Sequence, residues 1–297
     1  MAFLRIGSRG SALALWQAHY VAGCLKQLGV ETEIEIIKTA GDRMQSLSLV
    51  QAGGKGLFTK EIEEALLAGD IDVAVHSLKD LPTEHPAGLA IAAVPEREDP
   101  HDALVGKKLA DLPSGARVGT SSNRRAAQLR FLRRDLEISP VRGNVDTRLR
   151  KLKEGQYDSI VLAAAGLRRL GLEGEIAELF SPEQICPAPG QGALGIQTRA
   201  NDKAYEICSG MNHPPTAYAV KCERSVLAAL GGGCQLPIGA FAQVHRERLQ
   251  VMAGVFATDA SGWVRASGEG SMLDADTLGK HIGNELLAKG AGSLCVL

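Results

Sequence analysis

The sequence lacks closely spaced pairs of cysteine or histidine. Its six cysteines are scattered over 297 residues without a C-x-x-C pair, and its seven histidines show no metal-ligand spacing. Disulfide frameworks and structural zinc sites depend on such pairs, so we expect neither, nor a metal. Scattered free thiols fit a reducing compartment, and we expect a cytoplasmic protein. His76, which follows an apolar segment, fits a satisfied core residue.

Long apolar runs and an excess of charge of one sign are also missing. No apolar run reaches the roughly 18 residues of a transmembrane helix, and the first residues lack the pattern of a secretion signal. We therefore expect no membrane association. The formal net charge of −1 argues against a general nucleic-acid binder but permits local basic clusters. With 45% hydrophobic and 23% charged residues, the composition is that of an ordinary globular protein.

The pattern of apolar segments predicts an α/β protein of three domains. In the first two-thirds, strands such as Leu4–Gly7 and Val73–His76 alternate with helices, which favours largely parallel sheets with ligand sites at the carboxyl ends of the strands. After about residue 214, a helix, three strands and a final helix indicate a small α+β domain. Polar or proline-rich segments at 95–100 and 186–192 indicate two crossings. The expected domains are 1–94 with 187–212, 95–186, and 213–297.

Basic residues follow nearly every predicted strand. Arg124 and Arg125 come after Gly119-Thr120-Ser121-Ser122-Asn123, where a strand-to-helix turn offers free backbone N–H groups to an anion. Cations at helix N-termini oppose the helix dipole, so a whole set of them is poorly explained as solvated surface charge. We expect them to converge on a ligand that carries carboxylates or phosphates. The set comprises Arg9, Lys55, Arg124, Arg125, Arg142, Arg148 and Arg169.

One acid, Asp80, takes the matching position after another strand, in His76-Ser77-Leu78-Lys79-Asp80. A carboxylate among cations stays ionised, and it could stabilise a cation that develops on a substrate or take part in a proton relay. A structural salt bridge with Lys79 or with an arginine explains the same residue equally well. The sequence alone leaves both interpretations open.

Cys234 follows three glycines, in Leu230-Gly231-Gly232-Gly233-Cys234-Gln235-Leu236-Pro237. The preceding helix is predicted to end at Gly231, and the negative partial charge of a helix C-terminus does not lower the pKa of a thiol. Glycines let a bulky group approach the backbone around the sulfur. The pattern favours an attachment point over an activated nucleophile, with an inert cysteine in a turn as the alternative.

Seven ordered motifs make the chain resemble the porphobilinogen deaminase family, also called hydroxymethylbilane synthases, over essentially its whole length. They are Gly7 to Ser11 with Leu13, Ala14 and Gln17; Gly53 to Phe58; Val75 to Asp80; Gly119 to Arg125; Arg142 to Val145 with Thr147 and Arg148; Pro189 to Gly192; and Gly232 to Cys234. Asn123, where the family usually has leucine, and Asp146, at a variable position, depart from the pattern.

The resemblance implies a transferase of porphyrin and haem biosynthesis. Such an enzyme joins four porphobilinogen molecules head to tail, releases ammonia at each step and yields hydroxymethylbilane, a linear tetrapyrrole. The family also implies a dipyrromethane cofactor held by a thioether to Cys234. Because loss of ammonia makes the substrate electrophilic, the thiol needs only the correct position and no chemical activation. The implied fold has two α/β domains like those of periplasmic binding proteins, the first discontinuous, plus a small α+β C-terminal domain, in a monomer.

The resemblance also assigns roles to individual residues. Asp80 is implied to be the catalytic acid. Binding of the cofactor and substrate is implied for Arg9, Ser11, Gln17, Lys55, Phe58, Ser77, Lys79, Thr120, Ser121, Ser122, Arg124, Arg125, Arg142, Arg148, Arg169 and Gln191.

Two other functions would fit part of this pattern, and each requires further sequence features. A non-catalytic anion-binding or effector module would use the same α/β halves but leaves the third domain and Cys234 unexplained. A phosphate-handling transferase would use the same arginines but needs an acidic metal-binding pair, which the motifs do not show.

The glycine-bounded segment Gly41 to Gly56 is predicted to be a mobile cover over the site, with an ordinary surface loop as the alternative.

Overall fold

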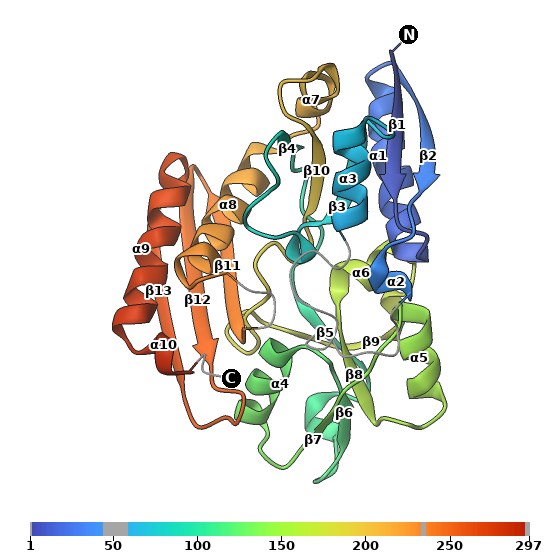
Figure 1. Cartoon of the computed structure of the whole chain (residues 1–297). Helices are drawn as coiled ribbons and strands as arrows, with labels where there is room; N and C mark the ends of the chain where they lie inside the picture. Colours follow the sequence, from blue (N-terminus) through green and yellow to red (C-terminus); the bar gives the residue numbers. More distant parts are fainter. Residues whose placement is uncertain (1, 44–58, 233–235, 295–297) are drawn as a thin grey trace. The chain divides into compact units, whose positions relative to one another are not determined.

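The computed structural model describes residues 2–43, 59–232 and 236–294 (Figure 1). The chain groups into two compact units, one formed by Met1–Arg97 with Ala193–Ala217 and the other by Glu98–Gly192 with Tyr218–Leu297. The predictions for Lys55, Phe58, Cys234 and most of the 41–56 cover lie outside the described residues. The boundaries of the three domains stay a prediction. No helix within the described ranges is both long and apolar enough to cross a bilayer.

The first unit is built on a five-stranded sheet of order β2-β1-β3-β10-β4. Its strands are β1 (Ala2–Ser8), β2 (Val30–Ile36), β3 (Val73–Ser77), β4 (Leu89–Ala93) and β10 (Leu194–Arg199). Its helices are α1 (Ala12–Gln27), α2 (Ala40–Arg43), α3 (Lys60–Ala68), α7 (Lys203–Ser209) and the 3-10 turn η1 (Leu78–Asp80). Apolar side chains of β1, β3 and β10 pack with those of α1 in one buried cluster.

Local signals in the sequence set the ends of the helices of this unit. The Ser11 hydroxyl caps α1 by accepting a hydrogen bond from the Ala14 amide at 3.3 Å. Gly29, with a φ of 75°, follows the end of α1, and Gly69 ends α3 in the left-handed conformation. Ser11 and Gly29 thus mark the two ends of α1.

The second unit contains another five-stranded sheet, of order β7-β6-β8-β5-β9. Its strands are β5 (Asp102–Gly106), β6 (Arg117–Gly119), β7 (Glu137–Ser139), β8 (Ser159–Ala163) and β9 (Ile176–Phe180). Its helical elements are η2 (Leu109–Asp111), α4 (Asn123–Leu132), α5 (Val145–Lys153), α6 (Ala164–Arg169) and η3 (Glu173–Glu175). Two apolar clusters, one on each set of alternating strand residues, enclose this sheet.

The expectation of largely parallel sheets is wrong for half of the strand pairs. In each five-stranded sheet two neighbouring pairs are parallel and two are antiparallel. The antiparallel strands are β10 and β5, which begin directly after the segments 186–192 and 95–100. Because neither strand is reached through a helical crossover, the preference of βαβ units for parallel pairing does not apply to it.

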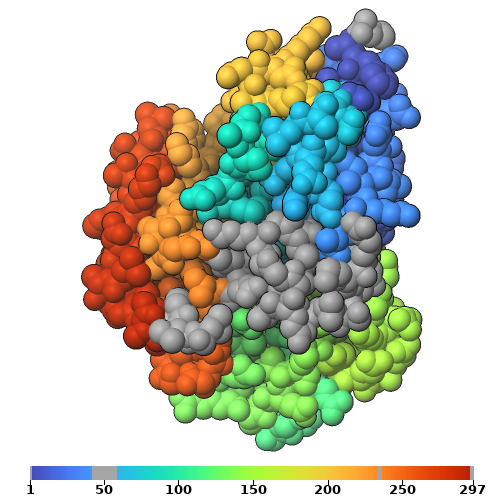
Figure 2. Space-filling view, viewed as in Figure 1, coloured from blue at the N-terminus to red at the C-terminus, as the bar shows by residue number. Residues whose placement is uncertain are grey.

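The C-terminal part of the second unit is the predicted α+β region. β11 (Ile238–His245), β12 (Arg248–Phe256) and β13 (Trp263–Ser271) form an antiparallel meander, confirming the three predicted strands. One face of the meander packs in an apolar cluster with α8 (Pro214–Ala229) and α9 (Ala275–Ala288). The short elements η4 (Met272–Asp274) and α10 (Ala291–Leu294) flank α9. In the space-filling view α9 is red and lies beside the orange α8 (Figure 2).

Two glycines allow α9 to pack closely on α8. A Cβ atom at Gly279 would overlap the carbonyl oxygen of Cys222 and lie 2.7 Å from the Cβ of Ser225. A Cβ atom at Gly283 would lie 2.5 Å from the Cβ of Ala229. Both distances are well inside van der Waals contact, so the approach of the two helices depends on these glycines.

We expect the substitution Gly279→Ala to destabilise the protein by about 1–3 kcal/mol, because the added methyl group forces the two helices apart. Gly23→Ala in α1 is the matched control, since no atom lies within 4 Å of the position that its new Cβ would take. The control should leave stability unchanged or raise it slightly. Urea denaturation of both variants measures the difference, and equal midpoints would contradict close packing at Gly279.

Candidate functional site

The arginine turn after β6 is held together by its own hydroxyl groups. The Ser122 hydroxyl caps α4 by accepting from the Arg125 amide at 3.4 Å, and the Thr120 hydroxyl accepts from the Ser122 amide at 3.2 Å. The Ser121 hydroxyl donates to the Val141 carbonyl at 2.8 Å. These contacts fix the backbone from which the two arginines project. The expected ligand-binding roles of the three hydroxyls stay predictions.

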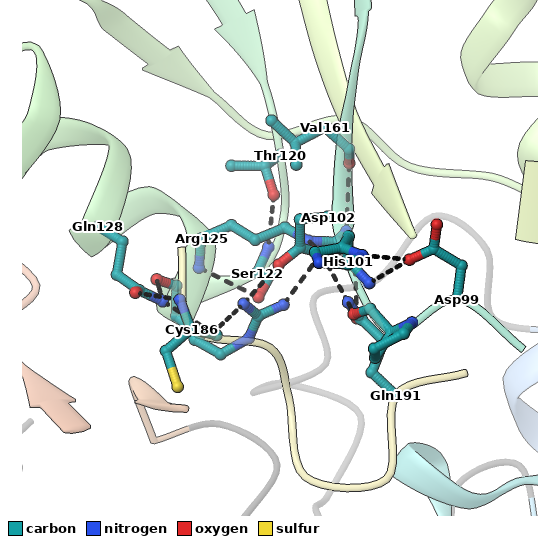
Figure 3. Close-up of polar contacts among 12 residues, drawn as sticks. Asp99, His101, Asp102, Thr120, Ser122, Arg125, Gln128, Val161, Cys186 and Gln191 are labelled. Atoms are coloured by element: carbon teal, nitrogen blue, oxygen red, sulfur yellow. Dashed lines mark hydrogen bonds and ion pairs between the residues drawn. The ribbon is translucent and has the colours of Figure 1, made fainter. Parts of the chain in front are cut away.

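Arg124 and Arg125 both converge on the carboxylate of Asp102, the first residue of β5. Figure 3 shows the approach of Arg125. Arg124 Nη1 donates to Asp102 Oδ2 at 2.6 Å, and Arg125 Nε donates to Asp102 Oδ1 at 2.8 Å. All three side chains are buried, with exposed fractions of 5%, 6% and 0% for Arg124, Arg125 and Asp102. The pair is therefore a rigid, desolvated cluster, not two mobile surface cations.

Asp102 is the counter-charge that the two arginines share. Burial alone would raise the pKa of the Asp102 carboxyl, but the positive charges of Arg124 and Arg125 outweigh that effect and hold its pKa well below the usual value. Asp102 is thus ionised, and two guanidinium groups share its carboxylate. Guanidinium groups suit the carboxylates of an anionic ligand.

Asp102 corrects the expectation that Asp80 is the one acid among the cations. The available signal was its position directly before the buried run Ala103-Leu104-Val105, where a charged side chain is tolerated only with a partner. The sequence could not tell which cation that partner is, because Arg124 and Arg125 stand 22 and 23 positions away.

Gln191 and Arg169 join the two segments that precede β5 and β10. Gln191 Nε2 donates to the Pro100 carbonyl at 2.7 Å and to Asp102 Oδ1 at 3.0 Å. Arg169, at the end of α6, donates from Nη2 to the Gly192 carbonyl at 2.7 Å. Gly192 has a φ of 85°, and a Cβ there would overlap the Glu98 carbonyl oxygen. The structure therefore brings Arg124, Arg125, Arg169 and Gln191 into one network.

Gln128 of α4 is a second residue of this network that the sequence did not indicate. Its side-chain amide accepts from the Cys186 amide at 2.7 Å and donates to the Cys186 carbonyl at 3.1 Å (Figure 3). Arg124 Nη1 also donates to that carbonyl, at 2.6 Å. Both polar groups of the Cys186 backbone are thus held by α4, which anchors the 186–192 segment to the arginine turn.

Arg142 and Arg148 lie at a second turn, before and within α5. Arg148 Nε donates to the Gly143 carbonyl at 2.7 Å, and the Arg142 carbonyl accepts from Lys151 Nζ at 3.2 Å. Both arginines are partly buried. Gly143 has a φ of 110°, and a side chain there would collide with Thr147. The backbone of this turn is therefore as constrained as that of the Arg124 turn.

The first unit holds the other predicted residues within the described ranges. Gln17 of α1 is buried, and its Nε2 donates to the Ser77 hydroxyl at 2.9 Å at the end of β3. Asp80 is exposed at the end of η1, after the partly buried Lys79. Ser11 caps α1, as described above, and Arg9 is partly buried after β1. Within the described ranges Asp80 forms no ion pair, so the salt-bridge interpretation gains no support there.

His76 precedes Ser77 on β3 and lies in the core of the first unit. It shares a 3.0 Å hydrogen bond between its Nε2 and Gln197 Oε1, and Gln197 Nε2 in turn donates to Glu63 Oε1 at 3.0 Å. Burial lowers the pKa of His76 to about 4, so the imidazole is neutral near pH 7. His76 is therefore the satisfied core residue that its sequence context indicated, and it stiffens the strand that carries Ser77.

Matches to known families cover most of the chain. Residues 4–206 match the family described as porphobilinogen deaminase, dipyromethane cofactor binding domain. Residues 217–288 match porphobilinogen deaminase, C-terminal domain. The chain belongs to the porphobilinogen deaminase family.

Full-length relatives agree with this membership. The porphobilinogen deaminase of Geotalea daltonii is 48% identical over 296 residues, which cover 98% of this chain and 93% of the relative. That of Thermus thermophilus is 49% identical over 292 residues, 96% of this chain and 95% of the relative. Among solved structures, a TRAP periplasmic solute binding protein from Desulfovibrio salexigens is a distant neighbour, at 11% identity and a TM-score of 0.41, over 71% of this chain and 72% of that one.

The donor set of the second unit fits the cofactor that the family description names. A dipyrromethane made from two porphobilinogen units carries acetate and propionate groups, so it needs cations with several N–H donors. Arg124 and Arg125 provide two buried guanidinium groups, and Arg169 adds a third. No group of three potential metal ligands occurs in the described residues.

We expect Asp102→Asn to destabilise the protein by about 3–5 kcal/mol at pH 7, because it leaves two buried guanidinium groups without a counter-charge. The control is Asp135→Asn, which removes an exposed partner of Arg133 at 2.7 Å and should change stability little. Urea denaturation measures both, and equally small effects would contradict the central role of Asp102.

The depressed pKa of Asp102 also predicts how the stability difference between the wild type and Asp102→Asn depends on pH. The pKa of Asp102 is depressed in the folded state, so its stabilisation is complete above the ordinary value of about 3.9 and is lost as the pH falls below it. The stability gap between the wild type and Asp102→Asn should therefore shrink below about pH 4. A gap that stays constant from neutral to acidic pH would contradict an ionised Asp102.

Proposed function

We propose that this chain is a cytoplasmic transferase that joins four porphobilinogen molecules head to tail, releases ammonia at each step and yields hydroxymethylbilane for haem biosynthesis. The observation that carries the proposal is the buried Arg124–Arg125 pair within the part of the chain that matches the cofactor-binding family. A substrate with two carboxylates per ring builds up negative charge as it is joined, and fixed cations are what such a product needs.

Cys234 is the proposed point of attachment of the dipyrromethane, through a thioether. When bound, this group supplies the pyrrole carbon to which the first substrate is joined. α8 ends at Ala229, and the following Gly231 and Gly232 have left-handed φ angles of 87° and 53°. A helix C-terminus does not lower the pKa of a thiol, so this sequence context supports a cysteine that serves as an attachment point and not as an activated nucleophile.

The arginines are proposed to bind the acetate and propionate groups. Asp102 contributes indirectly, because it holds Arg124 and Arg125 in fixed orientations before any ligand arrives. Donors fixed in advance bind an anion without the entropy loss of ordering flexible side chains. Arg9, Lys55, Lys79, Arg142, Arg148 and Arg169 are proposed for the carboxylates of the growing chain. Hydrogen bonds from Ser11, Ser77, Thr120, Ser121, Ser122, Gln17 and Gln191, and a contact with Phe58, complete the proposed set.

Asp80 is the proposed catalytic residue. Its carboxylate is exposed at the end of β3 and η1, on a strand whose Ser77 is fixed by Gln17. An exposed carboxylate can stabilise the positive charge that develops on a pyrrole nitrogen as ammonia leaves. It can also hold and return a proton at the aminomethyl nitrogen.

The proposal extends to how the protein works in the cell. We propose a monomer that acts on a small molecule and needs neither nucleic acid nor a membrane, since the net charge of −1 offers no general polyanion surface. The free thiols of Cys24, Cys186, Cys208 and Cys222 suit a reducing cytoplasm. We also propose the three domains bounded at 94/95, 186/187 and 212/213.

Asp80→Asn should lower the turnover of porphobilinogen by about a hundredfold or more, because it removes the charge but keeps the shape of the side chain. Asp70→Asn is the control, as Asp70 is an exposed acid of the same unit outside the proposed site. The assay follows ammonia and linear tetrapyrrole released from porphobilinogen by the purified holoenzyme. The wild type should release four ammonia molecules for each tetrapyrrole.

Two results would contradict these assignments. Near-normal turnover in Asp80→Asn would remove Asp80 from the chemistry and leave the proposed activity intact. Failure of the wild type to consume porphobilinogen, with its cofactor in place, would contradict the proposed function itself.

A further inference from the structure

A cavity of about 230 Å³ lies beside β13, the edge strand of the C-terminal meander. Its walls come from the segment that includes Pro182 and Cys186, from neighbouring residues of β12 and β13, and from the last turns of α9. None of its lining residues belongs to the set predicted to bind cofactor or substrate. The volume exceeds that of the roughly 150 Å³ cavities known to hold a benzene molecule, so a small organic molecule fits.

Arg265 is the cation of this cavity, and its polar groups are poorly satisfied. The guanidinium carbon lies 4.4 Å from the ring centroid of Trp263 and 5.5 Å from that of Phe256, which fixes the plane of the group by cation–π contact. Its Nε is buried and has no hydrogen-bond partner. Within the described residues Arg265 also forms no ion pair. A buried hydrogen-bond donor without an acceptor is rare in native proteins and points to a missing partner.

The other charged groups around the cavity are already engaged. Lys289 Nζ contacts Glu285 Oε1 at 2.6 Å and donates to the Arg265 carbonyl at 2.9 Å. The Glu183 carboxylate lies close enough for Arg265 to help lower its pKa, but it hydrogen-bonds with Ser181. Of the two cations that line the cavity, Lys289 is engaged by Glu285, so the Arg265 guanidinium is the group that can bind a ligand. It carries at most one positive charge.

A second donor stands beside Arg265. Ser267 is two residues further along β13, so its side chain leaves the same face of the strand. Met252 of β12 is the register partner of Ser267 and lines the cavity together with Pro182 and two alanines. A ligand would thus meet a planar cation and a hydroxyl of β13, the Glu285–Lys289 ion pair at the end of α9, and apolar groups elsewhere.

We propose that this cavity is a binding site for a small monocarboxylate, held by Arg265 and Ser267. A guanidinium offers two parallel N–H donors to a carboxylate, and the hydroxyl supplies a third. A single guanidinium matches a monoanion better than a phosphate dianion. The apolar lining selects a ligand with a short hydrocarbon part, and the volume excludes a molecule as large as a tetrapyrrole.

The two tryptophans of the chain, Trp16 and Trp263, allow a local measurement. In a Trp16→Phe holoenzyme, Trp263 is the one indole, and it stacks on the proposed binding group. Titration with sodium butyrate at constant ionic strength should change its emission in a saturable way. Butyramide, which has the same shape without the charge, should produce no saturable change.

Substitution of the cation separates this site from the arginines of the proposed active site. In Trp16→Phe/Arg265→Gln, butyrate should bind about tenfold more weakly or worse, because a charge-assisted pair is replaced by a neutral one. Trp16→Phe/Arg248→Gln is the matched control, since Arg248 is an exposed arginine of the same sheet, and it should bind butyrate as before.

Three outcomes overturn the proposal. They are the absence of saturation with butyrate, an equal response to butyramide, and undiminished binding in the Arg265→Gln variant. The first two comparisons use only the Trp16→Phe protein, so they decide the matter even if Arg265→Gln fails to fold. Turnover of porphobilinogen does not enter the readout.

Discussion

One fully buried carboxylate, that of Asp102, binds two buried guanidinium groups, and the organisation of the second unit depends on this contact. Asp102 begins β5, Arg124 and Arg125 begin α4, and Gln191 joins them from the segment before β10. Three separate stretches of chain thus meet at one charged centre. Removing any one charge would leave the others desolvated, which costs far more than an exposed ion pair returns.

The same contact explains how a protein with a net charge of −1 can serve a ligand rich in carboxylates. Positive charge is concentrated where the backbone is most constrained, at the hydroxyl-capped turn before α4 and near Gly192, which cannot carry a side chain. Rigid placement matters here, because guanidinium groups that are already desolvated and oriented bind an anion with little further loss of entropy. The part of the chain that matches the cofactor-binding family, residues 4–206, includes these arginines.

Much of this arrangement was predictable from the sequence because its signals are local. Ser11 and Gly29 bracket α1, glycine ends α3, and the alternating segments after residue 236 form the predicted meander. The position of Arg124 and Arg125 at a strand-to-helix turn was also correct. Each of these features depends on residues only a few positions apart, where propensity and capping decide the outcome.

The misses all involve contacts between distant residues. Asp102 and Gln128 act on partners that the sequence cannot place, because those partners stand many positions away along the chain. The strand directions of β5 and β10 were wrong because alternation of strands and helices says nothing about strands reached without a helical crossover. Cys234, the residue that the sequence singled out most strongly, lies outside the described residues, so chemistry must decide its role.

The central claim is that Cys234 carries a dipyrromethane that the arginine network holds. Intact-mass spectrometry of the purified wild type and of Cys234→Ser, followed by peptide mapping, tests it most directly. The account predicts that the wild type carries the extra mass of two pyrrole units on the Cys234 peptide and that the variant lacks it. A fully active wild type without this mass, or an adduct that maps to another cysteine, would contradict the account.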